Sequence, residues 1–195
     1  MAEAMSAAAP TLFNSPLETG VRAIVVLNAA YPRAFDVTEI AWFDRGPIDA
    51  ERLMVGGHWS AYWFNGRIYA SEIARGFDVL SLKPSEHLSA AEIAVAERVM
   101  QTTLNPQTQT RPVWEDHPDV AQAYLDQLAR SNGLEAGLAA QARTAVERWR
   151  GGRVDRPAAT ALSQALATVP EGAPAADAAR LKALSEMFAR LGRQG

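Results

Sequence analysis

The sequence contains no cysteine among its 195 residues. Disulfide bonds, thiolate metal sites and cysteine nucleophiles are therefore excluded for this chain. It also lacks any apolar run close to the roughly 18 residues that a membrane-spanning helix needs; the longest, residues 21–30, includes Arg22 and Asn28. The first ten residues, MAEAMSAAAP, have neither the basic nor the apolar region of a secretion signal. We therefore expect a cytoplasmic protein with no membrane partner.

The chain has no large excess of either charge. It carries 19 Lys and Arg residues against 22 Asp and Glu residues, which gives a net charge of −3. A protein that binds nucleic acid through bulk charge has a basic excess, so no nucleic-acid partner is expected. Hydrophobic residues make up 48% of the chain, a composition that supports a buried core in one medium domain or two small ones.

The N-terminal third combines a helix signal with a segment of ambiguous propensity. Ser15 has the position of an N-cap, Pro16 stands in the first turn and Glu18 completes a capping box, so a helix is predicted over residues 16–30. Residues 37–44 have capping-box spacing at their start but are rich in β-branched and aromatic residues. Local propensity therefore leaves both helix and strand open for this segment.

The middle of the chain has the pattern of a β-meander. Asn65 and Gly66 form the strongest short hairpin signal, because both residues tolerate a positive φ. They separate strands predicted at residues 59–64 and 67–72, and a second turn leads to a third strand at residues 77–82.

The rest of the chain is predicted to be helical, with capping signals, Gly and Pro between the segments. The expected helices cover residues 89–101, 118–131, 134–150, 157–168 and 174–191, and they suit a small antiparallel bundle. The predicted fold class is α+β: an N-terminal helix, a central three-stranded antiparallel β-meander and a C-terminal helical bundle. The expected divisions are a disordered N-terminus (1–11), a helical segment (12–36), a blade-like meander (37–84) and a helical region (85–195).

No catalytic or metal-binding motif is present. His58, His87 and His117 lie about 30 residues apart, without the close spacing typical of zinc ligands. The serines near them do not stand in a GxSxG turn, and no phosphate-binding glycine loop occurs. We therefore predict a protein that is not an enzyme, with no cofactor and no metal. A hydrolase that uses His58 or His117 as its base is the third-ranked alternative.

Aromatic residues are concentrated around the meander, with few Lys or Arg residues between them, which favours packing over base stacking. A single meander cannot bury all of these rings, and the predicted N-terminal helix is apolar on most sides, so both are candidates for a protein-binding surface. The residues predicted to bind a partner are Val21, Ile24, Val25, Leu27, Trp42, Phe43, Trp59, Tyr62, Trp63 and Phe64.

The first part of the chain resembles a known family. The words FNSPLETG (residues 13–20) and NAAYP (residues 28–32) are similar to the opening of the middle-component proteins of ABC-three-component systems, over about residues 12–44. This resemblance implies a small winged-helix-like adaptor that bridges an ATPase and an effector in a phage-defence system.

A second resemblance begins before the first one ends. The words DRGPID (residues 44–49), NGRIY (65–69), SEIARG (71–76) and PSEHL (84–88) are similar to the C-terminal end of LVIVD-repeat β-propeller proteins, over about residues 39–185. This resemblance implies the last blade and helical tail of an exported propeller. Because the two families meet within one structural element, we interpret the chain as a composite or designed sequence.

From these observations we expect a non-catalytic protein–protein interaction protein with a protein partner. It would act as an adaptor or neutralising partner in a phage-defence or toxin–antitoxin setting, and homo-oligomers are also open. The alternative is an orphaned propeller fragment with a structural role only.

Overall fold

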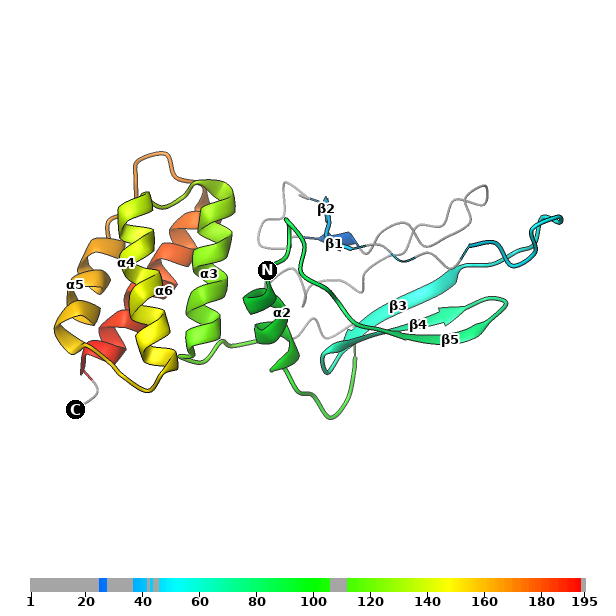
Figure 1. Cartoon of the computed structure of the whole chain (residues 1–195), viewed down its shortest axis with the longest axis horizontal. Coiled ribbons are helices and arrows are strands. Elements are labelled where there is room, and N and C mark those ends of the chain that lie inside the picture. Colours follow the sequence, from blue (N-terminus) through cyan, green and yellow to red (C-terminus); the bar gives the residue numbers. More distant parts are fainter. Residues whose placement is uncertain (1–24, 28–36, 42, 44–45, 106–111, 194–195) are drawn as a thin grey trace. The chain divides into compact units, whose positions relative to one another are not determined.

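The computed structural model describes residues 25–27, 37–41, 43, 46–105 and 112–193, with the backbone alone for residues 25–27 and 37–39. The chain forms two compact units, Met1–Val113 and Trp114–Gly195. Within the described residues, the first unit contains the strands and helix α2, and the second contains helices α3 to α6 (Figure 1). The α+β class with a central meander and C-terminal helices is thus confirmed. The helical region expected from residue 85 is divided, because its first helix belongs to the first unit.

The helix predicted over residues 16–30 is wrong where the structure describes it. Val25–Leu27 form strand β1, which pairs antiparallel with β2, Val37–Glu39. The physical reason is local as well as tertiary: the two adjacent valines favour a strand, and the pairing with β2 supplies the hydrogen bonds. The same pairing settles residues 37–39 as strand, while the rest of the predicted helix lies outside the described residues.

The meander follows the predicted pattern closely. Strands β3 (His58–Phe64), β4 (Arg67–Glu72) and β5 (Gly76–Leu80) form an antiparallel sheet in sequence order (Figure 1). The β3–β4 turn has Asn65 at φ +46° and Gly66 at φ +81°, as a two-residue hairpin with two positive φ values requires.

Helix α2 (Ala90–Glu97) is shorter than predicted but begins at the predicted capping box. Ser89 Oγ accepts a hydrogen bond from the Glu92 backbone N–H at 3.2 Å, and Glu92 Oε2 accepts one from the Ser89 N–H at 2.6 Å. Soon after the helix ends, Asn65 Nδ2 donates to the Gln101 carbonyl at 3.0 Å and Asn65 Oδ1 accepts from the Gln101 N–H at 2.7 Å. The hairpin turn is thereby fixed to the chain that follows α2.

The second unit is a bundle of four helices. They are α3 (Pro118–Ser131), α4 (Ala136–Arg150), α5 (Arg156–Leu166) and α6 (Ala175–Arg193). Helix α3 has the bounds that the sequence predicts, since Pro118 starts it and Asn132 ends it in the left-handed conformation at φ +54°. The core contains fully buried side chains from all four helices, among them Leu125, Leu128, Val146, Leu166, Leu181, Leu184 and Phe188.

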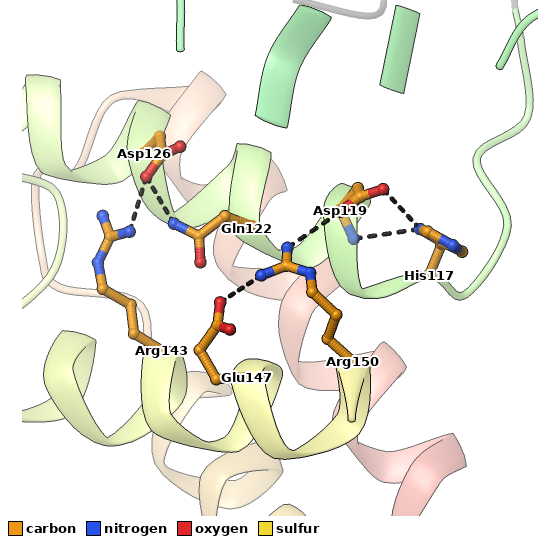
Figure 2. Close-up of polar contacts among 7 residues, drawn as sticks. All are labelled: His117, Asp119, Gln122, Asp126, Arg143, Glu147 and Arg150. Atoms are coloured by element: carbon orange, nitrogen blue, oxygen red, sulfur yellow. Dashed lines mark hydrogen bonds and ion pairs between the residues drawn. The ribbon is translucent and has the colours of Figure 1, made fainter. Parts of the chain in front are cut away.

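Helix α3 is held to two other helices by charged side chains. Arg143 of α4 donates to Asp126 at 2.7 Å, and Arg150 of α4 donates to Asp119 at 3.0 Å (Figure 2). Partial burial lowers the pKa of Arg150, but its hydrogen bonds to Asp119 and Glu147 outweigh that effect and raise it overall. These pairs set the rotation of α4 against α3.

A more buried network joins α3 to α6. Arg180 of α6 donates to Asp177 at 2.6 Å and to Gln127 of α3 at 2.7 Å. Asp177 and Gln127 are both buried, so these hydrogen bonds offset the cost of removing polar groups from water.

Helix α4 begins with a carboxylate cap. Glu135 accepts hydrogen bonds from the backbone N–H groups of Gly137 at 2.7 Å and Leu138 at 2.8 Å. These two hydrogen bonds stabilise the ionised carboxylate, and they lower the pKa of Glu135 from its ordinary 4.5.

The Asn65→Ala substitution is expected to loosen the join between the meander and α2. It removes both hydrogen bonds to Gln101 and places alanine in the left-handed region, at a cost of about 2 kcal/mol. Native-state amide exchange should show faster exchange at Gln101 than in the unsubstituted protein. Asn65→Asp is the matched control, since it keeps the acceptor and tolerates positive φ, and it should give a smaller effect. Equal exchange rates at Gln101 in Asn65→Ala and the unsubstituted protein would contradict this role.

The α4 cap should give a pH-dependent contribution to stability. Because the folded pKa of Glu135 is lowered, its contribution is present above the unfolded value and is lost as the pH falls through the folded pKa. Carboxyl-carbon NMR should show Glu135 titrating below 4.5, with the Gly137 and Leu138 amide resonances moving in the same pH range. Glu135→Gln should abolish that movement; its persistence in the variant would show that another group causes it.

Candidate functional site

Register divides the side chains of the meander between two faces. The directly opposed residues Ala61, Ala70 and Asp78 share one face with Trp63, Ile68 and Leu80. Ala61, Ile68 and Ala70 are buried there and Trp63, Leu80 and Leu82 pack against them, so this is the core face of the sheet.

The opposite face is made mainly of aromatic side chains. We define the aromatic face as the alternate residues Ser60, Tyr62, Phe64, Arg67, Tyr69, Ser71, Phe77 and Val79. The ring of Tyr69 lies 6.3 Å from that of Phe64 and 6.1 Å from that of Phe77, so one aromatic row crosses all three strands. Phe77 is 63% exposed and Val79 is 56% exposed. A row of this kind suits burial against another apolar surface.

An apolar loop precedes β3. Leu53 is 88% exposed, Val55 77% and Trp59 76%; Trp59 lies at the irregularity between His58 and Ser60 in the β3–β4 pairing. We call residues 53–59 the apolar loop, which continues into the first two residues of β3. When a partner covers apolar side chains with this exposure, the free energy of the complex is lowered.

The end of the apolar loop is held in place by a buried carboxylate. Glu72 Oε1 accepts a hydrogen bond from the Gly57 N–H at 2.7 Å, while Glu72 Oε2 accepts from Ala74 N–H at 2.8 Å and from the Arg75 N–H. The Ile73 N–H also donates to the Gly57 carbonyl at 2.9 Å. This anchoring lowers the conformational entropy that a partner would have to remove on binding.

The predicted partner-binding residues do not share one surface. Tyr62 and Phe64 lie on the aromatic face, Trp59 lies in the apolar loop, and Trp63 lies on the core face. Phe43 is half-buried, and Val25 and Leu27 belong to β1. The other predicted residues, Val21, Ile24 and Trp42, lie outside the described residues.

Phe77 and Val79 are the exposed residues of the aromatic face that the sequence prediction missed. Their signal was present: counting alternate residues across the Asn65-Gly66 turn and the next turn places Val79 opposite Tyr69 and Phe77 opposite Ser71.

The three histidines are not brought together by the fold. His58 Nε2 lies 2.6 Å from Asp78 Oδ2, and the His58 side chain is only 2% exposed. His87 is partly exposed beside Glu86, and His117 Nδ1 accepts the Asp119 N–H at 3.1 Å as the N-cap of α3. Each of the three side chains therefore has a local structural partner.

The serine side chains near the histidines do not form a nucleophile–base pair. Ser60 Oγ lies 3.2 Å from Ser71 Oγ on the aromatic face, whereas His58 reaches Asp78 on the core face. Within the described residues, no group of three His, Asp or Glu side chains could hold a metal ion. No helix in that same part of the chain is long and apolar enough to cross a membrane.

Comparison of the chain with protein-family models, with curated proteins and with solved structures finds no match. The two family resemblances therefore stay predictions.

Removing His58 should destabilise the meander. His58→Ala leaves the partly buried carboxylate of Asp78 without the imidazole, at an expected cost of about 3 kcal/mol. Urea unfolding followed through the meander amides by NMR measures this loss. His87→Ala, which changes an exposed side chain, is the matched control and should alter stability by less than about 0.5 kcal/mol. Equal effects of the two substitutions would contradict the structural role of His58.

Proposed function

We propose that this chain is a non-catalytic protein-interaction protein whose partner covers the aromatic face and the apolar loop. The observation that carries the proposal is the aromatic row Phe64–Tyr69–Phe77, which ends at a ring that is 63% exposed. Aromatic side chains dominate the binding energy of many protein interfaces, because they bury a large area at low conformational cost.

The free energy available from apolar burial indicates that the aromatic face and the apolar loop bind the partner together. Micromolar affinity needs about 8 kcal/mol of net binding free energy, and association itself costs at least about 4 kcal/mol. Phe77 and Val79 are the most exposed members of the aromatic face. At about 2–3 kcal/mol for full burial of each side chain, these two cannot supply that sum. The apolar loop adds Leu53, Val55 and Trp59, which brings the total for the exposed fractions to about 7–11 kcal/mol, close to that sum.

Charge near the aromatic face favours a protein partner over a nucleic acid. Base stacking is usually accompanied by cations that are available to phosphates. Here Arg67 pairs with Glu97 at 2.9 Å and Arg52 lies 3.6 Å from Asp49, while Arg75 donates to the Pro47 carbonyl at 2.8 Å. These arginines are therefore already engaged within the chain.

The biological setting rests on the resemblance to ABC-three-component middle components. That resemblance implies an adaptor in phage defence. A neutralising partner in a toxin–antitoxin pair is the other setting that we propose. A second copy of the chain is the other partner that such an aromatic surface would suit.

Phe77→Asp tests the proposal without changing the core face of the sheet. A charge at the exposed end of the aromatic row should reduce partner capture from extracts of expressing cells by at least about tenfold. Quantitative mass spectrometry of proteins retained by the immobilised chain measures this reduction, and light scattering shows whether the partner is a second copy.

Met100→Asp is the matched control for this experiment. Met100 is 70% exposed and lies beyond α2, outside the aromatic face. It should leave capture unchanged. Equal recovery of every captured protein by Phe77→Asp and Met100→Asp would reject the aromatic face as the binding surface.

A further inference from the structure

The helical bundle has an apolar groove of its own. The groove lies between α4, α5 and α6 and has a volume of about 520 Å³. The buried side chains of Phe188 and Leu191 contribute to it from α6. Leu138 and Trp149 line it from α4, and the α5 side is made mostly of alanine. Figure 1 shows these three helices within one unit.

The dimensions of the groove fit a helix. Its α4 wall runs from Leu138 to Trp149, which corresponds to about 16 Å, or three helical turns. On α5 the small residues Ala158, Ala161 and Ala165 follow one another at spacings of three and four. This spacing places them on one side of α5, where their small side chains let another helix approach closely. Larger apolar side chains at i, i+3, i+4 and i+7 of an incoming helix would then fill the groove.

One end of the groove is positively charged. Arg148, Arg153 and Arg156 are all exposed around the α4–α5 turn. The acidic residue that lines the groove at this end is Asp155. Its carboxylate caps α5 by accepting the Ala158 N–H at 3.1 Å and lies 3.5 Å from Arg148. Helix α5 contains no Asp or Glu, and its N-terminus adds the positive end of a helix dipole. This charge differs in sign from that of the whole chain, which is −3.

We propose that the groove binds an amphipathic helix of an acidic protein partner, with the carboxylates of that helix at the α4–α5 turn. The apolar lining supplies the binding free energy, and the three arginines select the acidic partner and its direction. This site is separate from the aromatic face, and its occupation does not depend on the function proposed for that face.

A displayed peptide library tests both parts of the proposal. The peptides are helices of about 12 residues with leucine at i, i+3, i+4 and i+7 and an equal mixture of Glu and Lys elsewhere. Selection on the full chain should enrich Glu over Lys at one end of the peptide. Selected peptides should bind the Ala161→Trp variant at least about tenfold more weakly, because the indole fills the groove.

Gln164→Trp is the matched control, since Gln164 is an exposed α5 residue that does not line the groove. It should change affinity by less than about twofold. The proposal is overturned if Glu and Lys are enriched equally, or if selected peptides bind Ala161→Trp as well as the unsubstituted chain. Sodium decanoate is the second probe: if it shifts the Trp149 indole resonance and no selected peptide does, the groove takes a small amphiphile and the helix proposal fails.

Discussion

The positive-φ turn at Asn65-Gly66 is the constraint on which the first unit depends. A two-residue hairpin fixes the register of β3 against β4, and a slip of one residue would move every side chain to the opposite face. The Asn65 side chain also forms hydrogen bonds with both backbone groups of Gln101, which fixes the chain that follows α2 to the sheet. The turn therefore determines which side chains face the core, and its Asn65 joins the meander to the segment after α2.

Local sequence signals predicted the structural features that depend only on neighbouring residues. The turn at Asn65-Gly66, the Ser89 capping box and both ends of α3 stand where the sequence predicts them. The helix expected over residues 16–30 shows the limit of such signals. Its capping pattern says nothing about β2, yet the pairing of β1 with β2 is what makes residues 25–27 a strand. The two valines favour a strand locally, but only the non-local pairing decides between that preference and the helix signal.

The candidate site was predictable in part, for a related reason. Sequence alone gathers Tyr62, Trp63 and Phe64 into one cluster because they are adjacent. In the sheet Trp63 packs on the core face, while its two neighbours join Phe77 and Val79 across the strands. Recognising the site required the alternation of strand side chains together with the register of three strands. The groove in the bundle could not be predicted in this way, because it depends on how closely α4 and α5 approach each other.

The two surfaces would select partners by different physical means. The aromatic face offers four rings, a valine, the hydroxyl groups of two serines and two tyrosines, and one arginine that is paired with Glu97. Its affinity would therefore come mainly from area buried and its specificity from shape. The groove has Arg148 in its lining, and the exposed Arg153 and Arg156 belong to the adjoining α4–α5 turn and the start of α5. A partner with the wrong charge would therefore be rejected even if its apolar residues fitted. Added salt should therefore weaken binding at the groove while leaving binding at the aromatic face almost unchanged. A chain with these two surfaces, one on each compact unit, has the physical means to bind two different kinds of partner.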